Sequence, residues 1–365
     1  MKIDFLGDWF MECIAIDLFC GIGGLTHGVQ KAGVNVVAGI DVDPTCKFAY
    51  ESNNDSVFIN KSIEDVMPEE LNELYPDNCI KILMGCAPCQ TFSNYYQRYQ
   101  KIDVDEKKWE LLYHYIDLIK GTKPDIVTME NVPQLVKKRI FKNFIYALEC
   151  WGYYVNWNIV DCVNYSVPQR RIRLVLLASI HGDISMIPHM NEKNKSMTVG
   201  DAIKYLPAIA DGEICANDPL HRASKLSETN KQRIIQSTPG GSWREWDDDI
   251  ILPCHKRQTG KSYTSIYGRM AWDKPSPTIT TQFYNYGSGR FGHPDQQRPI
   301  SLREGALLQS FPQEYKFFND AHMQTQKVLG KHIGNAVPVK LGEAIGNSII
   351  DHIYRKVNTD VKLYY

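Results

Sequence analysis

The stretch AIDLFCGIGGLTHGVQKAG, residues 15–33, runs from an apolar segment through a glycine-rich turn into a helical pattern. At the turn, Gly21, Gly23 and Gly24 allow the backbone to approach a ligand closely, and the amide groups at the start of the helix favour a negatively charged group. A strand, a glycine turn and a helix in this order open a doubly wound α/β sheet. Tight packing of the helix against the strand is the alternative explanation for the same glycines.

Two carboxylates flank this turn. Asp41 stands about twenty residues after Gly21, at the end of the next apolar run, where an acidic side chain accepts hydrogen bonds from a ribose diol. Asp17 stands just before the turn, and a carboxylate there suits a cationic ammonium group more than a pyrophosphate. The spacing also departs from G-x-G-x-x-G, because Gly24 follows Gly23 directly. These features favour S-adenosylmethionine, which carries both an ammonium group and a ribose, over NAD.

The first 180 residues alternate β-rich runs with helical stretches. This alternation predicts a doubly wound, mostly parallel sheet, which binds ligands at the carboxyl ends of its strands. The predicted strands are residues 14–19, 34–40, 56–59, 79–84, 125–129, 153–160 and 172–178. The predicted helices are residues 25–32, 44–52, 69–74, 109–120 and 136–150.

The alternation ends after Ser179. The next residues, to about 298, are rich in Asn, Ser, Thr, Gly, Pro and aromatic residues, which predicts a second, smaller domain of short strands and long loops. Helical pattern returns at residues 301–309 and 334–353. We therefore expect one domain from residues 1–180 plus 299–365 and another from residues 181–298.

The composition is that of a soluble globular protein: 365 residues, 43% hydrophobic and 23% charged, with no run of eighteen apolar residues and no secretory signal pattern. We expect a cytoplasmic monomer without a membrane partner, whose ten cysteines are reduced thiols. The net charge of −1 gives no global field that would attract nucleic acid. Residues 253–293 nevertheless hold one acidic residue, Asp273, and six basic residues: Lys256, Arg257, Lys261, Arg269, Lys274 and Arg290. A solvated loop region is the alternative interpretation of this basic window.

The stretch GCAPCQTFS, residues 85–93, places Cys86 and Cys89 two residues apart after an apolar run. A zinc site would need a second Cys-x-x-Cys or a matching His pair, and the sequence has neither. A redox pair stays formally open, but the long polar segment that follows differs from the helix that follows a thioredoxin motif. The third interpretation is a single nucleophile, Cys89, with Cys86 as a small apolar residue beneath a pocket.

Six motifs, in order, resemble those of the cytosine-5 DNA methyltransferases, a family with the S-adenosylmethionine-dependent methyltransferase fold. They are DLFCGIGG (17–24), PCQTFS (88–93), ENV (130–132), QRRIR (169–173), RPISLREGALLQSFPQEY (298–315) and GNAVPVKLGEAIG (334–346). Together they are far more specific than any one of them. The resemblance implies methyl transfer from S-adenosylmethionine to C5 of a cytosine that is flipped out of double-stranded DNA.

The resemblance also implies catalytic roles. The Cys89 thiolate would add to C6 of the base, Glu130 would bind the N3 and amino edge, and Arg171 and Arg173 would face O2. The other catalytic residues implied by the motifs are Pro88, which shapes the turn that presents the thiol, Gln90, Ser93 and Asn131. The loop SNYYQRYQ lacks the glycine that commonly follows the family's serine, so no residue beyond Ser93 is assigned a role.

The cofactor residues implied by the resemblance extend beyond the turn. Asp41 would bind the ribose, Asp65 would read the adenine amino group, and Leu111 would line the adenine face. Val42 replaces the larger apolar residue that often packs on adenine. The full set of expected cofactor residues is Asp17, Phe19, Gly21, Gly23, Gly24, Asp41, Val42, Asp65, Leu111, Asn335 and Ala336.

In this family the variable region between QRRIR and RPISLREG holds the target recognition domain. The basic window with its interleaved aromatic residues suits phosphate contacts and base readout, and SPTITTQ resembles the threonine-containing stretch of such domains. The expected DNA-binding residues are Lys256, Arg257, Lys261 and Thr280. The resemblance further implies a bacterial or phage modification enzyme, associated with the nucleoid when it acts, whose DNA site a restriction endonuclease could share.

Three alternatives remain open. A tRNA methyltransferase of the same fold typically has Cys-Phe-Thr before its last helical motif, and the absence of this tripeptide favours DNA. A catalytically silent DNA-binding regulator disagrees with the intact Cys89, Glu130, Arg171 and Asn335. An oxidoreductase would leave the ENV, QRRIR and GNAVP motifs unexplained.

Overall fold

The computed structural model describes residues 12–87, 110–188 and 196–361. Seven strands form one sheet in the order β3-β2-β1-β4-β5-β7-β6. Each strand lies within two residues of its predicted bounds. The strands are β1 (Cys13–Leu18), β2 (Asn35–Asp41), β3 (Val57–Asn60), β4 (Ile80–Gly85), β5 (Ile126–Asn131), β6 (Tyr154–Asp161) and β7 (Ile172–Ser179).

The sheet is mostly parallel, as predicted. β1 pairs in parallel with β2 and β4, β2 with β3, and β4 with β5. β7 runs antiparallel between β5 and β6, with Glu130 of β5 opposite Val175 of β7. Because β5 and β7 are antiparallel, the carboxyl end of β5 lies beside the amino end of β7. The ENV and QRRIR motifs therefore meet at one edge of the sheet.

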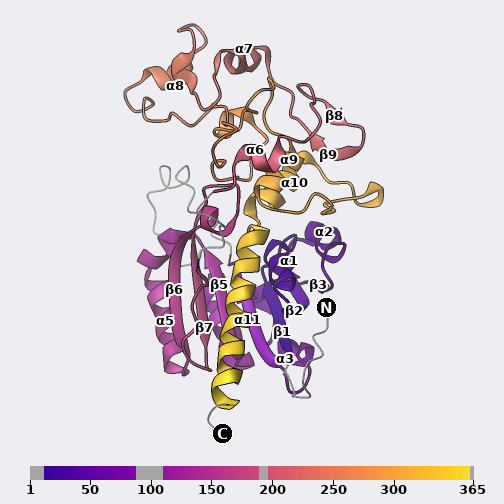
Figure 1. The fold of residues 1–365 in the computed structure, drawn as a ribbon, viewed down its shortest axis with the longest axis vertical. Coiled ribbons are helices and arrows are strands. Elements are labelled where there is room, and N and C mark those ends of the chain that lie inside the picture. Colours follow the sequence, from indigo (N-terminus) through magenta and orange to yellow (C-terminus); the bar gives the residue numbers. More distant parts are fainter. Residues whose placement is uncertain (1–11, 88–109, 189–195, 362–365) are drawn as a thin grey trace.

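Helices cover both faces of this sheet, which confirms the doubly wound prediction (Figure 1). On one face Ile14, Ile16 and Leu18 of β1 share a core with residues of α3, α4 and α5. On the other face Ala15 shares a core with residues of α1 and α11. The helices are α1 (Gly24–Lys31), α2 (Lys47–Glu51), α3 (Pro68–Leu74), α4 (Glu110–Thr122), α5 (Arg139–Cys150) and α11 (Val339–Val361).

The C-terminal helical prediction, residues 334–353, was wrong at its start. The structure has two helices, α10 (Gln326–Asn335) and α11, and Ala336 between them is extended, with φ −59° and ψ 146°. Pro338 explains the break, because proline pushes the preceding residue out of the helical region and has no N–H to donate. The break turns the chain at the GNAVP motif instead of burying that motif inside a helix.

Between β7 and α9 (Leu302–Leu308) the described residues form long loops, as predicted, but their short elements are helices as well as the short strands that we expected. These elements are α6 (Val199–Ile203), β8 (Ile214–Cys215), β9 (Asp218–Arg222), α7 (Glu228–Gln236) and α8 (Pro253–Lys256). β8 and β9 pair as a two-stranded sheet. Figure 1 shows α7 and α8 at the end of the molecule that lies away from the seven-stranded sheet. None of the helices in the described ranges combines the length and the apolar character that spanning a membrane requires.

Candidate active site

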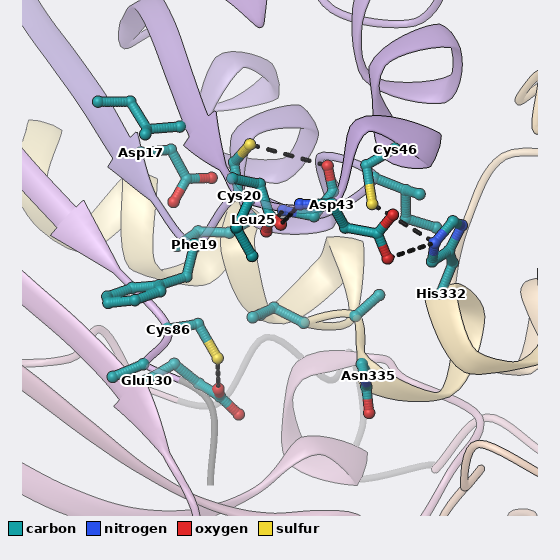
Figure 2. Close-up of a pocket in the computed structure, with 18 of the residues that line it drawn as sticks. Asp17, Phe19, Cys20, Leu25, Asp43, Cys46, Cys86, Glu130, His332 and Asn335 are labelled. Carbon is teal, nitrogen blue, oxygen red and sulfur yellow. Dashed lines mark hydrogen bonds and ion pairs between the residues drawn. The ribbon is translucent and has the colours of Figure 1, made fainter. Parts of the chain in front are cut away.

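A pocket of about 350 Å³ lies at the carboxyl ends of the parallel strands. Residues from β1, β2, β5 and β7, the segment just after β4, the start of α4, and α10 with the turn that follows it line the pocket, and Figure 2 shows part of this lining. Twelve of the predicted site residues line the pocket: Asp17, Phe19, Gly21, Asp41, Val42, Leu111, Glu130, Asn131, Arg171, Arg173, Asn335 and Ala336. Motifs from both ends of the chain therefore surround one cavity.

The predicted residues Pro88, Cys89, Gln90 and Ser93 lie outside the described residues. Ala87, the residue just before this motif, lines the pocket.

The three glycines of the turn have different surroundings. Gly21 lines the pocket with φ +51°, and a Cβ there would meet no atom within 4 Å. Gly23 and Gly24 are absent from the pocket lining. A Cβ at Gly23 would lie 2.5 Å from the side chain of Asn54, and a Cβ at Gly24 would lie 2.3 Å from the carbonyl oxygen of Val337. Of the three, only Gly21 reaches the pocket, whereas the other two allow close internal packing.

Phe19 has a positive φ of 60°, a conformation that costs free energy for a residue with a large side chain. It stands between the end of β1 and the glycine turn, and it lines the pocket. Figure 2 shows its ring on the same side of the pocket as Cys86 and Glu130. The turn thus holds a strained residue at the point where the pocket begins.

Asp17 is a buried carboxylate with one unpaired oxygen. Its side chain is 1% exposed, Oδ2 accepts a hydrogen bond of 2.7 Å from the Thr26 hydroxyl, and Oδ1 has no hydrogen-bond partner among the described residues. The pKa of Asp17 is raised to about 7, mainly by burial and also by the nearby Asp41, while the hydrogen bond from Thr26 opposes this shift. A cationic group in the pocket would favour the ionised form of this carboxylate.

Asp41 is the last residue of β2, and its carboxylate accepts hydrogen bonds from two backbone N–H groups beside the pocket. Its Oδ2 accepts from the Gly21 N–H at 2.9 Å, and its Oδ1 accepts from the Asp43 N–H at 2.9 Å. Each carboxylate oxygen can accept a further hydrogen bond. Val42 is 67% exposed and lines the pocket, so its side chain offers an apolar surface at this entrance.

Asp65 was expected to read adenine, but it is exposed and absent from the pocket lining. It is the last residue of a short 3-10 helix, Ile63–Asp65. Ser62 and Ile63, at the start of this turn, line the pocket instead. The tight turn places the acidic side chain on the solvent side, which the sequence pattern SIEDV did not reveal.

Glu130 is the second-to-last residue of β5 and is 3% exposed. The Cys86 thiol donates to its Oε2 at 2.7 Å, so Cys86 is a polar neighbour of this carboxylate and not merely a small apolar residue. The next residue, Asn131, donates from Nδ2 to the carbonyl oxygen of Ala87 at 3.2 Å. These two contacts join the end of β5 to the end of β4, just before the PCQTFS motif.

The two arginines of QRRIR have different partners. Arg173 Nε lies 2.9 Å from Glu130 Oε1 as an ion pair. The Arg171 guanidinium donates to the backbone carbonyls of Ile279, Gly334 and Ala336 at 3.0–3.3 Å. Burial lowers the pKa of Arg171 to about 9, so its guanidinium stays charged at neutral pH. Arg173 is thus the arginine that faces Glu130, while Arg171 ties three chain segments together.

The segment that contains Thr280 packs against the end of α10. A Cβ at Gly334 would lie 2.4 Å from the Thr280 carbonyl oxygen, so the glycine permits this contact. Asn335 is exposed and lines the pocket, and Ala336 lines it beside Arg171. The Thr280 side chain is exposed and absent from the lining.

The basic window divides into exposed and buried cations. Lys256, Arg257 and Lys261 are exposed, at and after α8. Arg269 is buried, and its guanidinium donates to four backbone carbonyls, those of Ile234, Ser237, His293 and Gln296. Arg290 is partly buried and donates to the carbonyls of Gly240, Gly241 and Thr264. Two of the six cations therefore hold loops together, which the charge count alone could not show.

The polar lining residues that the sequence analysis missed include a group of four that lie together: Asp43, Cys46, Lys331 and His332. His332 Nε2 lies 3.5 Å from Cys46 Sγ and 3.4 Å from Asp43 Oδ2, and Lys331 Nζ lies 2.9 Å from the same Oδ2. Asp43 and Cys46 follow β2, whereas the other two belong to α10. No local pattern links positions 286 residues apart, so only the fold reveals this group.

The chain is similar to known proteins along nearly its whole length. The family model described as C-5 cytosine-specific DNA methylase matches residues 14–351. The Type II methylase M.HgiDII of Herpetosiphon aurantiacus is 50% identical over 337 residues, which cover 92% of this chain and 94% of that protein. The Type II methyltransferase M.Sau96I of Staphylococcus aureus is 30% identical over 354 residues, or 92% of this chain and 75% of that one. A solved DNA modification methyltransferase encoded within an E. coli prophage shares the fold, with a TM-score of 0.70 and 20% identity over 95% of this chain and all of that chain.

Proposed function

Because the chain belongs to the family of C-5 cytosine-specific DNA methylases and is a DNA (cytosine-5-)-methyltransferase, we propose a specific reaction for the pocket. The enzyme transfers a methyl group from S-adenosylmethionine to C5 of a flipped cytosine in double-stranded DNA, through a covalent bond between Cys89 and C6. The observation that carries this proposal is the single cavity that joins Asp17 and Gly21 to Glu130 and Arg173.

The glycine-turn end of the pocket fits the cofactor. The unpaired, buried Oδ1 of Asp17 suits an ammonium group, and the spare lone pairs of Asp41 suit a ribose diol. The apolar surfaces of Phe19, Val42 and Leu111 suit an adenine ring. When bound, S-adenosylmethionine supplies an electrophilic methyl group.

The Glu130 end of the pocket fits the base. The Glu130 carboxylate accepts from the exocyclic amino edge of cytosine, and Arg173 keeps that carboxylate in place while it faces O2. Both groups stabilise the ring as it gains electron density from the Cys89 thiolate. The methyl group would pass to C5 as its bond to the sulfonium sulfur breaks, which leaves S-adenosylhomocysteine. Loss of the C5 proton and cleavage of the Cys89–C6 bond would then re-form the C5=C6 double bond and free the Cys89 thiolate.

The region from residue 181 to residue 298 is the proposed target recognition domain. Its exposed cations Lys256, Arg257 and Lys261 provide phosphate contacts, which position the duplex without reading its sequence. The Thr280 segment lies against α10, so this domain is connected to the cofactor pocket through Gly334 and Asn335.

Two measurements test the reaction. Bisulfite sequencing of DNA from cells that express the protein should reveal methylated cytosine in one sequence context. Purified protein should transfer label from S-adenosylmethionine to double-stranded DNA and not to tRNA. The Cys89→Ser variant should lose transfer, and Cys254→Ser, which alters an exposed thiol outside the pocket, should keep it. Full activity of Cys89→Ser would refute the covalent step, and label on tRNA alone would refute the choice of DNA.

The relatives named as Type II methylases support a restriction-modification setting. We propose that the modified sequence is protected against an endonuclease that cuts the same site. DNA from expressing cells should resist an endonuclease specific for the sequence found by bisulfite sequencing. DNA from cells that express Cys89→Ser should remain sensitive to it.

A further inference from the structure

Asp43, Cys46 and His332 form a compact group at one end of the pocket. Figure 2 shows them together, away from Glu130 and Cys86. Among the described residues, they are the one set of three Cys, His or carboxylate side chains whose ligand atoms all lie within 4.8 Å of one another. Cys46 is 3% exposed and His332 is 7% exposed, so the thiol and the imidazole are largely shielded from water.

The distances within this group match the edges of a tetrahedral metal site. With a metal–sulfur bond of about 2.3 Å and metal–nitrogen and metal–oxygen bonds of about 2.0–2.1 Å, neighbouring ligand atoms lie about 3.3–3.6 Å apart. His332 Nε2 lies 3.5 Å from Cys46 Sγ and 3.4 Å from Asp43 Oδ2. The third edge, from Cys46 to Asp43, is at most 4.8 Å, so it needs to shorten by no more than roughly 1 Å.

We propose that Asp43, Cys46 and His332 bind a divalent zinc ion, with the fourth coordination position open to the pocket. One thiolate, one imidazole and one carboxylate are ligand types that zinc accepts in proteins. The site is separate from the proposed reaction, because neither Glu130 nor Arg173 belongs to it and no step of methyl transfer passes through it.

His332 Nε2 becomes a metal ligand when the imidazole proton moves to Nδ1. The Thr45 hydroxyl donates to Asp43 Oδ1 at 2.5 Å, so its oxygen, which lies 3.1 Å from His332 Nε2, accepts from the Nε2–H. Zinc binding replaces this hydrogen bond by a metal–nitrogen bond as the imidazole proton shifts to Nδ1, and it releases the Cys46 proton to solvent as the thiolate forms.

Lys331 competes with the metal for Asp43. Its ammonium lies 2.9 Å from Asp43 Oδ2, but the Lys331 side chain is 52% exposed. The ammonium can therefore move into solvent when a cation takes its place at the carboxylate. This competition has a direct consequence: removal of the Lys331 charge should strengthen zinc binding.

Zinc at this position would connect two distant parts of the chain. Asp43 and Cys46 lie just after β2, which ends at the ribose-binding candidate Asp41, and His332 lies in α10 before Asn335. A bound ion would therefore fix one wall of the cofactor pocket relative to the C-terminal segment. Its expected effect is on the stability and the shape of this wall.

The test uses the full chain without a histidine tag. The protein is dialysed against ZnCl₂ and then against metal-free buffer, and bound zinc is measured by mass spectrometry. We expect about one equivalent for the wild type and less than about one-tenth for Cys46→Ser and for His332→Gln. Cys254→Ser is the matched control, because it alters an exposed thiol outside the group and should retain the ion.

Cobalt(II) and Lys331→Gln provide independent measurements. Cobalt in the wild-type site should give a thiolate-to-metal charge-transfer band that disappears in Cys46→Ser, and Lys331→Gln should bind zinc at least about threefold more tightly. Circular dichroism melting checks that the variants fold. The proposal is overturned if the wild type retains no zinc after dialysis or if the cobalt band survives in Cys46→Ser. If Cys46→Ser or His332→Gln does not fold, the Lys331→Gln result decides, and unchanged zinc affinity overturns the proposal.

Discussion

Arg173 Nε lies 2.9 Å from Glu130 Oε1, whereas the guanidinium of Arg171, two residues earlier, binds only backbone carbonyls among the described residues. The two arginines belong to one motif and both line the pocket. The two arginines differ in their partners. Arg173 faces the Glu130 carboxylate, which we propose binds the base, whereas Arg171 joins Ile279 to the turn after α10. The same residue type therefore has two different uses within three positions.

Lysine substitutions should separate these uses. Arg171→Lys keeps the charge but loses the planar fork that satisfies three buried carbonyls, so we expect the free energy of unfolding to fall by about 1–3 kcal/mol. Arg173→Lys should change the free energy of unfolding by less than about 1 kcal/mol but lower kcat/KM at least about tenfold, because the guanidinium that holds Glu130 is lost. Urea unfolding and steady-state kinetics measure both. Equal losses of stability in the two variants would contradict this division.

The raised pKa of Asp17 predicts that the affinity for S-adenosylmethionine depends on pH. Burial raises the pKa of this carboxylate to about 7 in the free protein. Below that pH, a bound cation must displace a proton, so the affinity for S-adenosylmethionine should fall by up to about tenfold per pH unit. Above that pH, this contribution should be constant. Titration calorimetry between pH 5.5 and pH 8.5 in buffers of different ionisation enthalpy would detect the released proton.

Asp17→Asn is the matched control for this prediction. It keeps the shape of the side chain but cannot ionise, so binding should be weaker and the pH dependence from this group should vanish. A variant that keeps the wild-type pH dependence would show that another group titrates.

The raised pKa of Asp17 also predicts that the free energy of unfolding of the ligand-free protein depends on pH. The pKa of Asp17 is about 7 in the folded protein, above its ordinary value of 3.8. The folded state therefore binds more protons between these values, and the contribution of Asp17 to stability falls as pH rises from about 4 to about 7. Asp17→Asn should thus gain stability relative to the wild type on going from pH 5 to pH 8. Urea unfolding at both values measures the difference, and an equal or opposite change would contradict the burial argument.

The sheet and much of the pocket could be predicted from sequence because their signals are local. Each strand is a short apolar run before a turn, and the glycine turn and ENV lie where such runs end. Parallel strands place these ends at one edge of the sheet, so local patterns were sufficient to bring Asp17, Asp41 and Glu130 together.

The features that sequence reasoning missed depend on contacts between distant segments. The group of Asp43, Cys46 and His332 joins positions 286 residues apart. Asp65 is exposed and outside the pocket lining, because it ends a tight turn whose first residues line the pocket instead. Arg269 was counted in the basic window, yet its guanidinium donates to four backbone carbonyls. A charge count cannot tell an exposed cation from one that satisfies buried carbonyls.

That distinction gives a prediction about DNA binding. Lys256→Ala or Arg257→Ala should weaken binding to all DNA sequences to a similar degree and reduce the slope of log affinity against log salt by about 0.9 for each lost phosphate contact. Their stability should remain within about 0.5 kcal/mol of the wild type, because both side chains are exposed. Arg269→Ala should instead destabilise the fold by about 3 kcal/mol or more, because it leaves four carbonyls without their donor.

Lys142→Ala is the matched control, since it removes the same charge from an exposed position on α5, beside the seven-stranded sheet (Figure 1). Fluorescence anisotropy with specific and unrelated duplexes at several salt concentrations measures the affinities and slopes. Because the charge change is identical, an effect of the overall field would appear equally in Lys142→Ala and Lys256→Ala. A direct phosphate contact would appear only in the latter. Equal slopes for Lys256→Ala, Arg257→Ala and the wild type would therefore remove α8 and the residues just after it from the DNA-binding surface.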